Sequence, residues 1–172
     1  DKGHGQLLRA FAALAKERPD VQLAFLGDGP LEQELRELAR RLNVAERVHF
    51  LGFQSNPLAF VARASIFVLP SLREGFPNAL LEAMSVGKAV IAADCRSGPR
   101  ELLAPQTPPE NKTNSIDYAP FGLLTQPLDP AASDRDSGTL SDPEERLRQA
   151  MESLLDAPEL RARYAEAARK RA

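Results

Sequence analysis

Residues 65–94 read SIFVLPSLREGFPNALLEAMSVGKAVIAAD, and this stretch decides the fold. Its two ends, residues 65–70 and 88–94, are short apolar runs that are typical of strands buried inside a domain. Between them, apolar residues recur at helical spacing up to Gly87, which is well placed to end a helix. A strand, a helix and a second strand in this order predict two parallel strands joined by a helix on one face of the sheet.

The rest of the chain continues this alternation of helices and short apolar strands. Further strands are expected at residues 21–27, 47–53 and 121–126. Helices are expected at residues 5–17, 31–42, 56–64, 142–155 and 158–172. Strands that are apolar on both faces and separated by helices predict a parallel sheet that helices cover on both sides. We therefore expect an α/β fold with a doubly wound parallel sheet, Rossmann-like, in one domain over residues 1–172.

One segment, residues 104–120, departs from this alternation. It carries prolines at positions 105, 108, 109 and 120 and shows little hydrophobic periodicity. We expect a loop insertion here, because long irregular segments in compact domains are usually functional or mobile. The segment comes after the carboxyl end of the strand at residues 88–94, so we expect it to be mobile and to border the ligand side of the sheet.

The composition of the chain excludes several classes of protein. The formal net charge is −2 over 172 residues, so the charge balance gives no support to a nucleic-acid partner. Cys95 is the only cysteine, which excludes a disulfide framework and a zinc site of several thiolates, and fits a reducing compartment. No apolar run reaches the ~18 residues of a membrane span. We expect a cytoplasmic protein, either free or peripheral at the inner face of the membrane.

The turn that leads into the central helix is suited to approach a ligand. Ligands of open α/β sheets bind beyond the carboxyl ends of the strands, where loops enter helices. Backbone N–H groups at a helix start attract phosphates, and the nearest donors here are the amides of Phe76, Asn78 and Ala79. Gly75 lets the backbone come close to a ligand without a side chain in the way.

Two glutamates, Glu74 and Glu82, flank this helix start. Helical geometry predicts that Glu82 shares with Asn78 the face away from the sheet, with its side chain leaning toward the helix N-terminus. A carboxylate there can accept two hydrogen bonds from a vicinal diol, such as that of a ribose. Glu74 would then contact another part of the same ligand, and a nucleotide sugar has the required groups. The alternative is that both are solvated charges, favoured by the helix dipole or by the exposed helix face.

The spacing of Glu74 and Glu82 resembles the Glu-x7-Glu element of the retaining glycosyltransferases of family 4, also called group 1. Other segments match that family in its own order, namely KGHGQLLRAFA, LAFLGDGPLEQEL, RVHFLGF and SGPRELL. The resemblance implies a GT-B architecture, in which two Rossmann-like domains face each other across a cleft. The chain would be the C-terminal, donor-binding domain, truncated at both ends and without the N-terminal GT-B domain.

The resemblance also implies two catalytic residues. Glu74 would hydrogen-bond hydroxyl groups of the transferred sugar. Lys2 matches the family lysine that neutralises the diphosphate, and it would stabilise the departing nucleotide by transition-state electrostatics. The alternative for Lys2 is a solvated side chain near the chain terminus.

Further residues would bind the donor. By the same resemblance, Glu82 would hold the ribose, and the amides from Phe76 to Ala79 would meet the sugar and the diphosphate. Phe53 would line the base, with a place in the hydrophobic core as the alternative. Gly98, in the segment SGPRE, would lie near the donor.

The reaction implied by the family is transfer of a sugar from a nucleotide-sugar donor with retention of anomeric configuration. A UDP-linked hexose or N-acetylhexosamine is the expected donor, and a lipid-linked or polysaccharide acceptor is expected from the GPRE variant of the motif. Alternatives are a nucleotide-sugar epimerase or a phosphorylase on the same fold, and a non-catalytic module that binds nucleotide sugars.

No metal cofactor is expected. Asp134 and Asp136 fit the Asp-x-Asp pattern by which other glycosyltransferases bind a divalent cation. That pattern belongs at a strand end, whereas these two residues lie in a polar Ser/Asp/Gly stretch that predicts a solvated loop.

Overall fold

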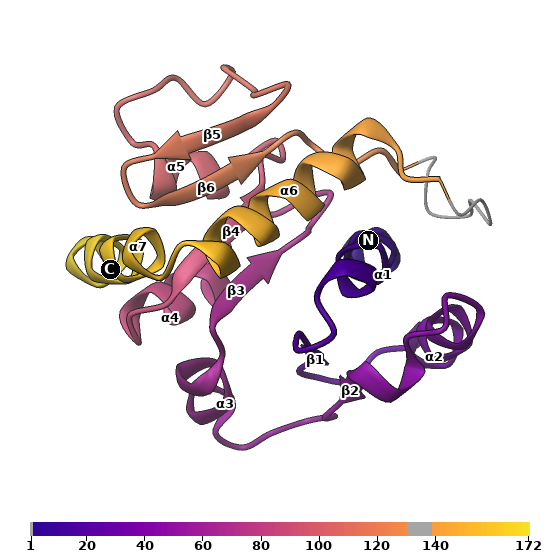
Figure 1. The fold of residues 1–172 in the computed structure, drawn as a ribbon. Helices are drawn as coiled ribbons and strands as arrows, with labels where there is room; N and C mark the ends of the chain where they lie inside the picture. Colours follow the sequence, from indigo (N-terminus) through magenta and orange to yellow (C-terminus); the bar gives the residue numbers. More distant parts are fainter. Residues whose placement is uncertain (1, 131–138) are drawn as a thin grey trace.

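The computed structural model describes residues 2–130 and 139–172. The helices are α1 (His4–Glu17), α2 (Glu32–Arg41), α3 (Pro57–Arg63), α4 (Asn78–Ser85), α5 (Pro99–Leu103), α6 (Asp142–Asp156) and α7 (Pro158–Arg171). The strands are β1 (Leu23–Phe25), β2 (Val48–Phe50), β3 (Ile66–Leu69), β4 (Ala89–Ala93), β5 (Ile116–Ala119) and β6 (Gly122–Thr125), and a short 3₁₀ helix covers Ala45–Arg47. The alternation of strands and helices expected from the sequence is therefore confirmed (Figure 1).

The stretch at residues 65–94 folds as predicted, into two parallel strands with a helix between them. β3 pairs with β4 in the register Ile66↔Ala89 to Leu69↔Ala92. β4 pairs in parallel with β6 on its other edge, and the strand order in this sheet is β3-β4-β6-β5. All five residues of β4 are buried, as expected for a central strand that helices cover on both faces.

The two faces of β4 meet different sets of helices, with α7 contributing to both. Val90 and Ala92 pack in a cluster with residues of α3, α4, α5 and α7. Ala89 and Ile91 pack in a second cluster with residues of α1 and α6 and with Tyr164 of α7. Figure 1 shows α6 running across the sheet, on the opposite face from α4. Helices on both faces are the arrangement that the doubly wound prediction requires, and the fold class is confirmed.

The sheet differs from the prediction in its continuity. β1 and β2 pair with each other in parallel, from Leu23↔Val48 to Phe25↔Phe50, and form a two-stranded sheet apart from the four-stranded one. The two sheets share their core through α1, because Leu7 and Leu14 face the β4 side whereas Leu8 and Phe11 face α2. Periodicity identifies strands but carries no information on which strands pair, so the sequence could not predict this division.

The loop predicted over residues 104–120 is wrong at residues 116–119. Residues 116–119 form β5, which pairs antiparallel with β6 through a two-residue turn, in the register Ile116↔Thr125 to Ala119↔Gly122. The strand is only four residues long and a proline follows it, so its alternation was too short to be recognised. The five-residue helix α5 within SGPRELL was also not predicted from the sequence.

The remaining part of that segment, residues 104–115, contacts the carboxyl end of β4 through Lys112 and Thr113. The Lys112 ammonium donates to the Cys95 carbonyl (2.8 Å), and the Thr113 amide donates to the Asp94 carboxylate (2.9 Å). The Arg100 guanidinium donates to the Thr107 hydroxyl (2.9 Å). Polar contacts therefore attach this segment, which has few apolar anchors, to the end of β4 and to α5. Its mobility stays a prediction.

Candidate functional site

The loop between β3 and α4 runs from the carboxyl end of a parallel strand to a helix start. Leu80, Ala83 and Met84 of α4 are fully buried against the sheet. Asn78 and Glu82 are exposed on the other face of the helix, which confirms the predicted division of its two faces. The Asn78 amide donates to the Phe76 carbonyl (3.0 Å), so this amide already has a partner within the loop.

Lys2 and Glu74, the two predicted catalytic residues, are in direct contact although 72 positions separate them. The Lys2 ammonium donates to the Glu74 carboxylate at 2.7 Å. The Lys2 side chain is 56% exposed, and the Glu74 side chain is only 9% exposed. The carboxylate is therefore held in a largely enclosed place, with a cation that solvent can still reach.

Gly3 explains how the amino end of the chain comes so close to this loop. Its φ is 65°, and a Cβ atom there would lie 2.0 Å from the Pro70 carbonyl oxygen at the end of β3. Only a glycine allows this backbone approach, because any side chain would collide with main-chain atoms that cannot move aside. The close approach places Lys2, the preceding residue, beside Glu74.

A third segment, the turn between β4 and α5, reaches the same loop. The Ser97 hydroxyl donates to the Glu74 carbonyl at 2.5 Å. Gly98 has a φ of 91°, and a Cβ atom there would lie 2.4 Å from the Pro77 ring and 3.2 Å from the Gly75 carbonyl. Gly98, which the sequence analysis placed near the donor, therefore packs directly on the loop that carries Glu74.

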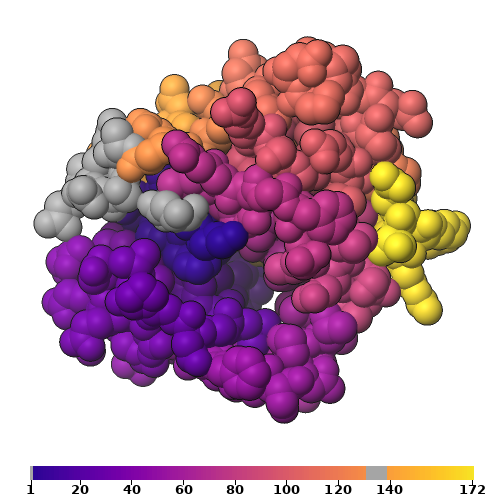
Figure 2. Space-filling model, turned by 180° about the vertical axis from the view of Figure 1, so that it is seen from behind, coloured from indigo at the N-terminus to yellow at the C-terminus, as the bar shows by residue number. Residues whose placement is uncertain are grey.

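Two aromatic residues of the predicted site are exposed. Phe53 follows β2 and is 77% exposed, so the alternative of a core residue is wrong. Phe76, in the loop before α4, is 56% exposed. Figure 2 shows the surface hollowed beside the N-terminal residues (indigo), between the purple β1–β2 part of the molecule and the pink part that follows residue 70. Phe53 and the Glu74 loop belong to these two different parts.

A buried cluster of charges lies behind the Ser97 turn, and the sequence analysis did not find it. Arg100 donates to the Asp94 carboxylate through Nε (3.1 Å) and Nη2 (2.6 Å), and to the Asp117 carboxylate through Nη1 (3.3 Å). Lys112 lies 3.4 Å from the Asp94 carboxylate. Asp94 is fully buried and Arg100 is 4% exposed. The available signal was a single aspartate directly after an apolar strand, which alone does not indicate a partner.

Cys95 lies next to this cluster and is also buried. Burial raises the pKa of the Cys95 thiol, and the nearby Glu74 carboxylate raises it further. A thiol with a raised pKa is a poor nucleophile at neutral pH, so Cys95 is not a candidate for covalent chemistry.

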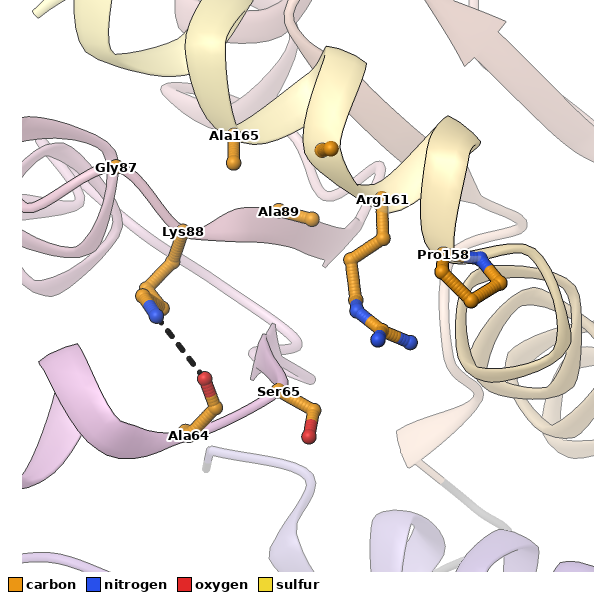
Figure 3. A pocket seen from close by; sticks show the side chains of 9 residues that line it. Ala64, Ser65, Gly87, Lys88, Ala89, Pro158, Arg161 and Ala165 are labelled. Atoms are coloured by element: carbon orange, nitrogen blue, oxygen red, sulfur yellow. Dashed lines mark hydrogen bonds between the residues drawn. The ribbon is translucent and has the colours of Figure 1, made fainter.

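A pocket of about 290 Å³ lies at the opposite end of the sheet, near the amino ends of β3 and β4. Figure 3 shows Lys88 pointing across it to Ala64, and Arg161 entering it from α7. The Lys88 ammonium donates to the Ala62 and Ala64 carbonyls, and Arg161 donates to the carbonyls of Leu154 and Leu155. Both cations thus satisfy carbonyl groups at helix ends. The pocket is a structural feature, and the predicted site lies elsewhere.

The residues that the structure describes offer neither a cluster of metal ligands nor a helix that could span a membrane. In residues 2–130 and 139–172, no group of three or more His, Cys, Asp or Glu side chains is arranged to hold a metal ion. Asp134 and Asp136 lie outside the described residues. The expectation that no metal is required therefore stays a prediction. Within the same ranges, none of the helices combines the length and the apolar character needed to cross a bilayer.

Comparison with known families decides the family of the chain. The family described as "Glycosyl transferases group 1" matches residues 1–112 of the chain. The chain belongs to the group 1 glycosyl transferases. The matched part includes Lys2, the loop with Glu74 and the Ser97 turn, so all three segments that meet at the site lie within it.

Two relatives resemble the chain over nearly its whole length. It is 36% identical over 165 residues to an uncharacterized glycosyltransferase of Methanocaldococcus jannaschii. The aligned residues cover 95% of this chain and 41% of the relative. It is 33% identical to the N-acetylgalactosamine-N,N'-diacetylbacillosaminyl-diphospho-undecaprenol 4-alpha-N-acetylgalactosaminyltransferase of Campylobacter jejuni, over 99% of this chain and 39% of the relative.

The fold has close neighbours among solved structures. The Anabaena protein HepE, crystallised in complex with UDP, superposes with a TM-score of 0.75 at 25% identity, over 98% of this chain and 40% of that one. The fold is that of the C-terminal Rossmann-like domain of GT-B glycosyltransferases. The chain spans about two fifths of the length of these relatives.

Proposed function

We propose that the chain is the donor-binding domain of a retaining glycosyltransferase. The enzyme moves a hexose or N-acetylhexosamine from a UDP-linked donor to a lipid-linked or polysaccharide acceptor. The observation that carries this proposal is the 2.7 Å contact between Lys2 and Glu74 at the entrance to α4. A cation for the diphosphate and a carboxylate for the sugar hydroxyls meet where the phosphates would lie, at the carboxyl edge of the sheet.

Each of the two residues has a separate part in the proposed chemistry. The Lys2 ammonium stabilises negative charge on the diphosphate as the bond to the sugar breaks. The Glu74 carboxylate accepts hydrogen bonds from hydroxyl groups of the transferred sugar and holds its reacting carbon in place. The 9% exposure of Glu74 supports this role, because an enclosed carboxylate is oriented more tightly than a solvated one.

Donor binding is assigned to helix α4, to the backbone at its start and to Phe53. Glu82, exposed on the outer face of α4, accepts hydrogen bonds from the ribose diol. The amides of Phe76 and Ala79 are the proposed phosphate donors, since the Asn78 amide is engaged with Phe76. Phe53, which follows β2 and is 77% exposed, lines the base.

The relatives support the choice of donor and acceptor. HepE was crystallised with UDP, and the Campylobacter relative is named for transfer of N-acetylgalactosamine to a diphospho-undecaprenol substrate. Because the relatives are more than twice as long, we propose that an N-terminal GT-B domain of the same protein supplies the acceptor side. An undecaprenyl-type acceptor would place the enzyme in the cytoplasm at the inner face of the membrane.

The proposed function is tested by comparing the domain alone with the full-length protein. Calorimetry on the 172-residue domain is expected to show weak binding of UDP and weaker binding of GDP and ADP. The domain alone should transfer no sugar, because half of the cleft is missing. The full-length protein should transfer sugar from a UDP-hexose or UDP-N-acetylhexosamine to an undecaprenyl-diphosphate-linked acceptor, with the product anomer assigned by proton NMR.

Each alternative has its own result in this experiment. Transfer by the isolated domain would contradict the two-domain proposal. Binding of UDP-sugar by the full-length protein without transfer to any acceptor would favour a non-catalytic binding module. An inverted anomeric product would contradict retention.

Glu82→Ala is expected to weaken UDP binding to the domain by roughly 10- to 100-fold, because hydrogen bonds to a charged group contribute about 1.5–3 kcal/mol. The loss should be similar for UDP and for uridine, since both carry the ribose diol. Calorimetry measures both affinities. Glu34→Ala is the matched control, because Glu34 is also an exposed helical glutamate but lies on α2. An equal loss in both variants, or none in Glu82→Ala, would refute the ribose assignment.

A further inference from the structure

The buried charge cluster behind the Ser97 turn holds the backbone of that turn, residues 95–98, in place. Its four charged members, Asp94, Arg100, Lys112 and Asp117, carry two negative and two positive charges. Burying an ion is costly unless it is paired and hydrogen-bonded. Asp94 meets this condition, because its carboxylate accepts from the Arg100 guanidinium and from the Thr113 amide (2.9 Å).

The cluster joins the elements on both sides of residues 95–98. Asp94 directly follows β4, Arg100 lies in α5, and Lys112 and Thr113 belong to the segment before β5. The Lys112 ammonium also donates to the Cys95 carbonyl (2.8 Å), inside the turn itself. A turn that is held at its first residue, and whose flanking residues are tied to each other, has few ways to move.

This turn is in contact with the loop that carries Glu74. The Ser97 hydroxyl donates to the Glu74 backbone carbonyl at 2.5 Å. Gly98 packs on Pro77, where a Cβ atom would come within 2.4 Å of the ring. The hydrogen bond and the packing contact hold the two ends of the Glu74–Pro77 segment.

We propose that Ser97 is a positioning residue, which the Asp94–Arg100 pair holds in place and which fixes the backbone of Glu74. The hydroxyl binds the backbone of Glu74, and it acts by orienting the residue that holds the sugar. This inference rests on the proposed function of Glu74. It adds Ser97, which lies in the connection between β4 and α5 rather than between β3 and α4. The chemistry proposed for Glu74 and Lys2 does not by itself call for this residue.

The test is Ser97→Ala in the full-length protein, with Ser97→Thr as the conservative variant. Ser97→Ala should lower kcat by roughly 10- to 100-fold, because a small displacement of a group that orients the reacting sugar has an effect of this size. KM for the UDP-sugar should stay within about twofold, since Glu82 and the start of α4 remain in place. Ser97→Thr keeps the hydroxyl and should recover most of kcat.

Ser153→Ala is the matched control. The Ser153 hydroxyl donates to the Ala150 carbonyl (2.9 Å) within α6, so this variant removes a hydrogen bond of the same kind. Its kcat is expected to equal that of the unchanged protein. A kcat of Ser97→Ala within about twofold of the unchanged protein, or an equal loss in Ser153→Ala, would overturn the inference.

A second readout separates this inference from the proposed function. Amide hydrogen exchange of residues 73–79 should become faster in Ser97→Ala and remain unchanged in Ser153→Ala, whether or not the protein transfers sugar. Asp94→Asn should increase exchange in residues 95–98 as well, because it weakens the ion pair that holds the turn. Unchanged exchange of residues 73–79 in Ser97→Ala would refute the positioning role. Absence of transfer together with the expected exchange would refute only the proposed function.

Discussion

Glu74→Gln in the full-length protein is expected to lower kcat for sugar transfer by about 100- to 1,000-fold, the size of effect found when a preorganised polar contact to the reacting group is removed. Gln keeps the shape of the side chain but loses the charge, so it orients the sugar hydroxyls less well and no longer pairs with Lys2. The affinity for UDP should stay within about twofold, because UDP lacks the transferred sugar. Steady-state kinetics and calorimetry with UDP measure the two quantities.

The comparison with Glu82→Ala makes this prediction specific. Glu82→Ala is expected to lower the affinity for UDP, whereas Glu74→Gln is expected to lower kcat. The two variants should therefore show opposite patterns of affinity and turnover. Lys2→Met should also lower kcat, and the double variant Lys2→Met/Glu74→Gln should lose less than the product of the two single losses, because the residues act as a contacting pair. Equal loss of UDP affinity in Glu74→Gln and Glu82→Ala would contradict the division of roles.

Arg9→Met should reduce the free energy of unfolding of the domain by roughly 3–5 kcal/mol, the cost of leaving one charge of a buried pair without its partner. Arg9 in α1 lies 2.7 Å from the Glu144 carboxylate in α6, and their side chains are 3% and 1% exposed. For a domain of this size the loss corresponds to a decrease of roughly 10 °C in Tm. Urea denaturation and thermal unfolding of the domain measure it.

A second substitution at Glu144 should restore most of this loss. Arg9→Met/Glu144→Gln removes the buried charge, while the Gln amide oxygen can still accept the hydrogen bond that Glu144 receives from the Ser141 amide (2.8 Å) at the start of α6. Lys170→Met is the control, because it breaks the exposed Lys170–Glu166 pair and should leave stability nearly unchanged. If the double variant is as unstable as Arg9→Met, the loss comes from packing rather than from the unpaired charge.

Much of the fold could be predicted because it is encoded locally. The apolar runs around residues 66–69 and 89–93, and the helical spacing between them, specify the β3–α4–β4 unit from neighbouring residues alone. The exposed positions of Asn78 and Glu82 followed from the same helical spacing. β5 escaped recognition, since four residues offer too few alternations and its stability comes from pairing with β6.

The candidate site, too, has features that the sequence predicts and contacts that only the tertiary structure shows. The sequence by itself determined the helix start, the two glutamates that flank it and the edge of the sheet where they lie, because spacing along one segment sets all three. Only the tertiary structure decided that Lys2 meets Glu74, that Ser97 holds its backbone, and that Asp94, Arg100 and Lys112 share one buried cluster. These contacts join residues from separate strand connections. They form because glycines at positions 3 and 98 let those segments approach, and because buried charges are stable only where opposite charges reach them.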